Sequence, residues 1–272
     1  MLLSAEQKNN EEIKNQLVNL WCEVFSDSEE YVRLILPFLP FFDCYAVFEK
    51  EEIVSAMYLL PSEIKIGEKL YKGRYLYAAA TKEKSRKNGY MSLLINEAID
   101  TLKDKGDFIS LVPANDGLYS YYARFGFESA MYNYVTKLTC DGVCNLSDGE
   151  ALKAEKVNTL RKEYFSCAHH FTDKTMEYAL DCYRFFSSEF LESKGKAFLY
   201  AEDENTVYEG LFESSEREEY VTFLKETFKG ETEVISAFRL DAASEKTRCG
   251  MVKAFNSALQ NEKEIYMNHT LM

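Results

Sequence analysis

Histidine, paired cysteines and long apolar runs are what this sequence has least of. Its 272 residues include only 3 histidines, His169, His170 and His269, and its 7 cysteines contain no Cys-x-x-Cys pair. Because zinc and redox sites usually group such residues closely, we predict no metal site and reduced thiols. Asp173 follows His169 by one helical turn, a pair that is more often an exposed hydrogen bond than a ligand set.

The segments that direct a protein into or across a membrane are also missing. The opening MLLSAEQKNNEEIKNQL has neither the basic n-region nor the unbroken apolar stretch of a signal peptide. No later window has the length of a membrane span. We therefore expect a cytoplasmic protein without a membrane partner.

Positive charge is scarce. The chain has 45 acidic side chains against 32 basic ones, a formal net charge of −13. This field repels nucleic-acid backbones, so we expect no nucleic-acid partner, and an amine-bearing partner is easier to accommodate. An acidic surplus is also common on an ordinary solvated surface. The loops of serine hydrolases (Gly-x-Ser-x-Gly) and nucleotide hydrolases (Gly-x-x-x-x-Gly-Lys) are absent as well.

The hydrophobic pattern predicts a mixed α/β (α+β) chain in two modest domains. In the first part we expect two helices before Pro37, three strands between 42 and 81, a helix over 89–103, a strand at 108–113, a short helix over 116–124 and a strand over 130–138. The polar stretch CDGVCNLSDG, 140–149, reads as a linker. In the second part we expect helices over 150–165, 172–192 and 216–228 and strands at 197–203, 206–213, 233–240 and 264–271.

The strongest local signal lies in residues 75–99, YLYAAATKEKSRKNGYMSLLINEAI. An apolar strand leads into a basic loop with one glycine and then into an amphipathic helix. The first N–H groups of a helix have no partner within it, and the helix dipole adds positive charge there. Gly89 allows a tight turn, while Lys84, Arg86 and Lys87 add cations. The segment therefore predicts a site for a diphosphate.

Two segments resemble the signatures of the GNAT superfamily of acetyl-coenzyme A-dependent N-acetyltransferases. The diphosphate loop of that family reads Arg or Gln, two residues, Gly, one residue, then Gly or Ala. Arg86 and Gly89 match it, and Met91 replaces the small sixth residue. Downstream, Asn115 and Tyr122, with Gly-Phe after them, have the spacing of the other GNAT signature.

This resemblance implies a GNAT domain over residues 1–140, with a mixed, mostly antiparallel central sheet flanked by helices and with acetyl-CoA as co-substrate. Tyr122 would stand beside the sulfur and protonate the departing thiolate, a plausible role for a phenol. The main chain of Tyr77 to Thr81 would polarise the thioester carbonyl. The implied cofactor-binding residues are Ala79, Ala80, Thr81, Lys84, Arg86, Lys87, Asn88, Gly89, Tyr90, Met91 and Asn115.

A narrower resemblance concerns the whole chain. The opening LWCEVFSDSEEYV and the ending EIYMNHTLM are similar to two-domain acetyltransferases of the enhanced-intracellular-survival type. That likeness implies a degenerate GNAT-like domain over 150–272, which here has neither signature. In that group the terminal carboxylate can enter the site as a base, so Met272 is a candidate catalytic residue. Asp43 and Glu52 are alternative bases that the sequence does not rank.

Two functions remain open on the sequence. The first is an N-acetyltransferase that moves an acetyl group to a primary amine of a small molecule or peptide by direct attack. The second is a non-catalytic CoA-binding or protein-interaction module, because Met91 and the second half depart from the family pattern. An aminoacyl-tRNA-dependent transferase is disfavoured, since the net charge opposes tRNA. No motif encodes the acceptor or the oligomeric state.

Overall fold

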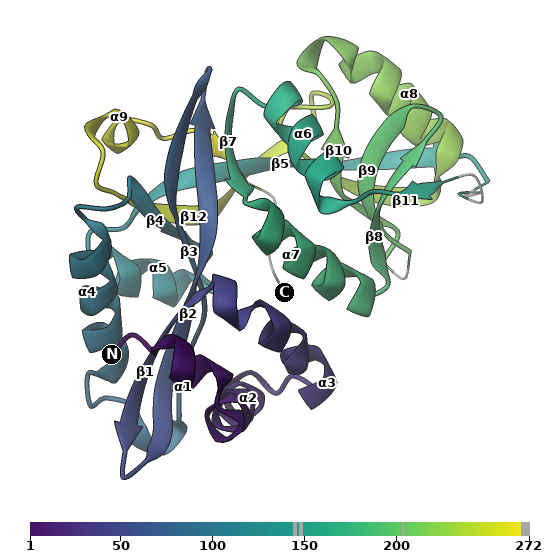
Figure 1. The fold of residues 1–272 in the computed structure, drawn as a ribbon. Helices are drawn as coiled ribbons and strands as arrows, with labels where there is room; N and C mark the ends of the chain where they lie inside the picture. The colour runs from purple at the N-terminus through teal and green to yellow at the C-terminus, as the bar shows by residue number, and fades with distance from the viewer. Residues whose placement is uncertain (144–145, 147–148, 203, 268–272) are drawn as a thin grey trace. The chain divides into compact units, whose positions relative to one another are not determined.

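The computed structural model describes residues 1–143, 146, 149–202 and 204–267, and the chain in it forms two compact units (Figure 1). Unit 1 comprises Met1–Glu63, Tyr71–Glu128 and Met251–Glu262. Unit 2 comprises Ile64–Leu70, Ser129–Gly250 and Lys263–Met272. Among the described residues, no helix combines the length and the apolar character that a membrane span needs.

Unit 1 is built from a mixed sheet and two sets of helices. Its helical elements are α1 (Ala5–Asn9), α2 (Glu11–Phe25), α3 (Glu29–Val32), the 3-10 helix η1 (Arg33–Phe41), α4 (Tyr90–Leu102), α5 (Asp116–Ala123) and α9 (Ser257–Gln260). Its strands are β1 (Asp43–Glu49), β2 (Glu52–Ile66), β3 (Lys69–Thr81), β4 (Phe108–Leu111) and the end of β12 (Glu245–Ala254). The strand order is β12-β4-β3-β2, with β1 paired to β2.

The two faces of this sheet carry different helices. Leu76 of β3 belongs to a core cluster that includes Leu94 of α4 and Tyr122 of α5. Tyr77, the next residue, meets Trp21 of α2 with ring centroids 5.2 Å apart. Successive side chains of a strand point to opposite faces, so α4 and α5 cover one face while α2 covers the other, as Figure 1 shows.

The strands of unit 2 also lie in a mixed sheet. Its strands are β5 (Glu128–Asp141), β6 (Glu150–Ala151), β7 (Cys167–Phe171), β8 (Ser188–Ser193), β9 (Lys196–Ala201), β10 (Thr206–Leu211), β11 (Lys229–Ser236) and β13 (Ile265–Tyr266), in the order β7-β13-β5-β11-β10-β9-β8-β6. Its helices are α6 (Ala154–Tyr164), α7 (Asp173–Phe185), η3 (Ser214–Glu216) and α8 (Arg217–Thr227). The predicted class, a mostly antiparallel mixed sheet flanked by helices, is confirmed.

Several predicted elements need correction. The helix expected over 172–192 ends at Phe185, because Ser187 turns into the left-handed region at φ 54 and β8 follows. Strands β7 and β12 were not predicted. The first four of the ten residues of β12 are exposed and polar, so this strand lacks an apolar pattern. The strand expected over 264–271 covers only Ile265–Tyr266 among the described residues.

The compact units also differ from the predicted boundaries of 1–140 and 150–272. Residues 129–140 belong to unit 2, because β5 pairs with β11 from Tyr134 to Asp141 and with β13 at Met131 and Tyr132. Residues 251–262 return to unit 1, where Met251 of β12 pairs with Leu111 of β4. Pairing between strands that are far apart in the chain assigns both segments to these units, and the local composition does not predict this assignment.

A buried polar cluster lies in unit 2. The guanidinium of Arg161 is fully buried, forms an ion pair with Glu209 and donates to the carbonyl of His169 at 2.8 Å. The hydroxyl of Tyr266 donates to Glu209 Oε1 at 2.8 Å. His169 and His170 lie in β7 and are fully buried, so the expected exposed pair of His169 and Asp173 is wrong. The described cysteines are free thiols, and Cys144 and His269 lie outside the described residues.

Burial of these histidines predicts a loss of stability in acid. Burial, helped by nearby Arg161, lowers the pKa of His169 from 6.5 to about 3. The pKa of His170 is also lowered, by burial first and then by Arg161, His169, Lys162 and Lys65. The contribution of each neutral, buried histidine to the free energy of unfolding is fully present above the unfolded pKa. It falls by up to about 1.4 kcal/mol per pH unit as the pH drops toward the folded pKa.

Urea unfolding at pH 7, 6, 5 and 4 measures this loss. We expect His170→Leu to flatten the pH dependence by about half, because one of two buried imidazoles no longer takes up a proton on unfolding. Equal slopes for the wild type and for His170→Leu would contradict the assignment.

Candidate active site

Strand β3 is interrupted by an irregularity at the point where the loop signature begins. Ala78 has φ 46, a left-handed conformation that strands rarely contain. Leu76 and Ala79 both contact the same core cluster, although strict alternation would place Ala78 on that face. A bulge of this kind re-aims the residues after it. The main chain from Ala79 to Thr81 therefore continues β3 with its side-chain alternation shifted by one residue.

The neighbouring strand also ends near this point. The parallel register of β3 with β4 runs from Gly73↔Phe108 to Tyr75↔Ser110. Residues Leu76 to Thr81 continue past the last registered pair, on the side that leads to the basic loop. Ser55 of β2 is hydrogen-bonded to the C-terminal end of β3, since its hydroxyl lies 3.1 Å from the Ala80 carbonyl and 2.8 Å from the Thr81 hydroxyl. Sequence reasoning missed Ser55, which carries no local signal.

The basic loop reaches α4 through two left-handed residues. Lys87 has φ 68 and Gly89, the N-cap of α4, has φ 80. A side chain at position 89 would meet no atom within 4 Å, so the backbone conformation rather than crowding favours glycine there. No side chain caps α4, and its first N–H groups have no partner within the helix. Such N–H groups could hold an anion, as the sequence predicts.

Side chains of the basic loop add positive charge near these N–H groups. Lys84, Arg86, Lys87 and Asn88 are exposed, and the Arg86 side chain donates to the Thr81 carbonyl at 3.3 Å. Met91 is partly buried and contacts the core cluster of unit 1. Its side chain therefore belongs to the core in this conformation. The donor set of unpaired N–H groups and exposed cations fits a diphosphate.

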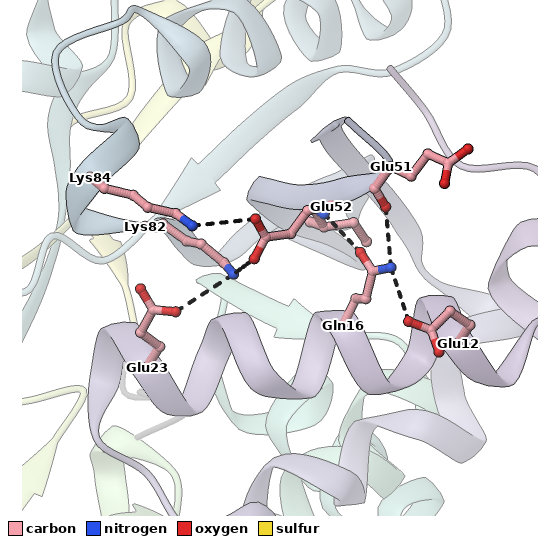
Figure 2. Close-up of polar contacts among 8 residues, drawn as sticks. Glu12, Gln16, Glu23, Glu51, Glu52, Lys82 and Lys84 are labelled. Carbon is pink, nitrogen blue, oxygen red and sulfur yellow. Dashed lines mark hydrogen bonds and ion pairs between the residues drawn. The ribbon is translucent and has the colours of Figure 1, made fainter. Parts of the chain in front are cut away.

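Carboxylates of the β1–β2 hairpin contact the loop, which the sequence did not predict. Glu52 forms ion pairs with Lys82 and Lys84, and Glu49 accepts a hydrogen bond from Tyr90 (Figure 2 shows Glu52). The hydrogen bond from Lys82 and then that from Lys84 lower the pKa of the Glu52 carboxyl. A carboxylate held in this way is a poor proton acceptor.

The second candidate base is engaged as well. Asp43 Oδ2 lies 2.9 Å from Arg74 Nε in an ion pair. Met272, the third candidate, lies outside the described residues. Neither of the two described candidates is therefore a free base. Among the described residues, no group of three or more His, Cys, Asp and Glu side chains could hold a metal ion.

Tyr122 lies in the core beside the end of β3. It is 7% exposed, and its ring meets Tyr121 and Phe127 edge-on with centroids 5.3 and 5.9 Å away. Its hydroxyl makes no hydrogen bond with any residue that the structure describes. Burial raises its pKa to about 12. The phenol is therefore protonated and has a donor to offer.

Asn115 has a local structural task. Its side-chain oxygen accepts from the Leu118 N–H at 3.2 Å and so caps α5. The cap fixes the start of the helix that carries Tyr122. Tyr119 and Tyr121 are partly buried against the same core cluster. Of the sequence-predicted residues, Ala79, Met91 and Tyr122 thus contact one core in unit 1.

A family model matches the part of the chain that carries these residues. Residues 7–130 match the family model described as an acetyltransferase (GNAT) domain. No curated protein matches the sequence. The loop, the bulged end of β3 and Tyr122 all lie within the matched residues.

The fold is shared with solved structures at low identity. A probable N-acyltransferase of Enterococcus faecalis V583 has a TM-score of 0.71 at 14% identity, over 97% of this chain and 74% of that one. A GCN5-related N-acetyltransferase from Anabaena variabilis has a TM-score of 0.68 at 16% identity, over 94% and 74%. Eis1 from Mycobacterium abscessus has a TM-score of 0.63 at 8% identity, over 89% and 71%, in line with the predicted two-domain resemblance. Residues 7–130 of this chain therefore match a GNAT acetyltransferase domain.

Proposed function

We propose that this protein moves an acetyl group from acetyl-CoA to a primary amine of a small molecule or peptide by direct attack. The observation that supports this most is the conjunction of three features in unit 1. The main chain is bulged at Ala78, the N-terminus of α4 is uncapped behind Gly89, and the protonated Tyr122 contacts the same core. The net charge of −13 suits a cationic acceptor.

The loop would bind the diphosphate of the cofactor. The N–H groups from Asn88 to Met91 would donate to it, and the side chains of Lys84 and Arg86 would neutralise its charge. Ala79, Ala80 and Thr81 would lie along the thioester arm, with Lys87, Tyr90 and Asn115 around it. When bound, acetyl-CoA supplies the acetyl group and a thiolate leaving group.

Residues of β3 and α5 would carry the chemistry. Main-chain N–H groups between Tyr77 and Thr81, re-aimed by the bulge, would stabilise the oxyanion that forms as the amine attacks. As the carbon–sulfur bond breaks, Tyr122 would donate its proton to the departing thiolate, and the proton that the attacking nitrogen loses would restore the phenol, so that the products are an amide and free CoA thiol. The proposal assigns no general base, since Asp43 and Glu52 are ion-paired.

Gly89→Val tests the cofactor loop. A β-branched side chain strongly disfavours φ 80, so we expect the loop to shift and the Kd for acetyl-CoA to rise at least about tenfold. Isothermal titration with acetyl-CoA measures this change. Gly195→Val is the matched control, because Gly195 has φ 73 and likewise has no atom within 4 Å of an added side chain.

Both variants should lose similar stability, and only Gly89→Val should lose affinity. If the two variants bind acetyl-CoA equally well, the loop does not grip the cofactor. If the wild type shows no heat of binding, the proposed function is wrong.

A further inference from the structure

Two lysines at the start of the basic loop form ion pairs with the same carboxylate. The Lys82 ammonium forms an ion pair with Oε1 of Glu52, and the Lys84 ammonium lies 3.3 Å from Oε2 of the same carboxylate (Figure 2). The two lysines differ in how far their side chains are exposed. The side chain of Lys82 is 11% exposed, whereas that of Lys84 is 67% exposed.

Lys82 is held from several sides. Glu23 of α2 contributes a second carboxylate 3.7 Å from the Lys82 ammonium. The Lys82 N–H also donates to the Val54 carbonyl at 2.9 Å. Removing this ammonium from its partners would leave a buried charge uncompensated, which is costly. We expect Lys82 to stay in place when a ligand binds.

Lys84 can leave at low cost. Its only ion pair with a described residue is the one to Glu52, and an exposed pair of this kind is weak. If Lys84 departs, Glu52 keeps the closer Lys82 and is not left unpaired. An arriving phosphate offers more negative charge than a shared carboxylate.

We propose that the Lys84 ammonium moves from the Glu52 carboxylate to a phosphate group of the cofactor when the cofactor binds. Glu52 therefore lowers the affinity for the cofactor, because its ion pair with Lys84 has to break first. This inference rests on the proposed function. Glu52 is then neither a general base nor a cofactor contact. It sets how much anionic charge a ligand needs in order to capture Lys84, and it favours ligands with several phosphate charges over uncharged thioesters.

The neighbouring glutamate provides a matched control. Glu51 carries the same charge one residue away, and its side chain points away from both lysines in Figure 2. Its carboxylate forms no ion pair with any residue that the structure describes, and only its carbonyl is used, by Gln16 at 3.2 Å. Glu51→Gln therefore removes one negative charge near the loop without releasing Lys84.

Isothermal titration of acetyl-CoA into the wild type, Glu52→Gln, Glu51→Gln, Lys84→Met and Glu52→Gln/Lys84→Met tests the exchange. Because an exposed pair is worth little, we expect Glu52→Gln to lower the Kd about two- to fivefold, and Glu51→Gln to change it less than about 1.5-fold. In the Lys84→Met background, the Glu52→Gln gain should disappear.

Each other result overturns the exchange. Weaker binding by Glu52→Gln would mean that the carboxylate preorganises the loop. Equal effects of Glu52→Gln and Glu51→Gln, or a gain that persists without Lys84, would mean that only general electrostatics act. A wild type that binds acetyl-CoA while failing these comparisons refutes the exchange alone, whereas a wild type that does not bind refutes the proposed function as well.

Discussion

Tyr122→Phe should lower kcat for acetyl transfer by about 10² to 10⁴-fold while leaving the Kd for acetyl-CoA within about twofold. The substitution removes one oxygen from a ring that is packed between Tyr121 and Phe127, so the core keeps its shape. Because the hydroxyl makes no hydrogen bond with the described residues, its loss leaves no partner unsatisfied among them. The effect is therefore expected on proton donation alone, measured by thiol release with a panel of amines.

Tyr121→Phe is the matched control. Tyr121 is the preceding residue, contacts the same core, and its hydroxyl lies 3.3 Å from that of Ser92. We expect its kcat to stay within about twofold of the wild type. If both variants turn over normally, Tyr122 has only a packing role. If the wild type binds acetyl-CoA but no amine in the panel releases thiol, the non-catalytic binding module becomes the better account.

The pH profile gives a second readout for Tyr122. Burial raises its pKa to about 12, so the proton donor is present throughout the neutral and mildly alkaline range. For stability, a raised pKa means that its contribution is complete below ~10 and is lost as pH rises toward about 12. Ionisation of this phenol should therefore cause no fall in kcat below about pH 11.

Breaking the buried ion pair of unit 2 should have the largest effect on stability. Glu209→Leu leaves the guanidinium of Arg161 buried without its carboxylate, and the Tyr266 hydroxyl loses its acceptor. Such a change costs about 3–5 kcal/mol of unfolding free energy, measured by urea titration at pH 7. That is a large part of the marginal stability of a typical protein.

Two further variants give this prediction its controls. Glu189→Gln breaks an exposed pair, in which Arg184 Nε lies 3.0 Å from Glu189 and the side chains are 45% and 38% exposed. Its cost should be under about 1 kcal/mol. The double variant Arg161→Met/Glu209→Leu removes both buried charges and should recover much of the single-variant loss. A double variant as unstable as the single one would show that packing, and not the stranded charge, dominates.

The sequence by itself determined the features of unit 1 that depend on neighbours along the chain. The three strands before the loop, the helix after Gly89 and the short helix carrying Tyr122 all follow from apolar periodicity and turn residues. The loop and its left-handed glycine could be predicted for the same reason, because a helix N-terminus and its cap are local structures.

The tertiary structure alone decided what depends on contacts between distant segments. Strands β7 and β12 pair with strands far along the chain, and the four exposed residues that open β12 give it no apolar pattern. The buried histidines were misread because burial depends on what surrounds a strand and not on its own residues. The same holds for the active-site region. Only folding brings Glu52 to Lys82 and Lys84, because ion pairs form wherever the backbone places opposite charges and no spacing in the sequence announces them.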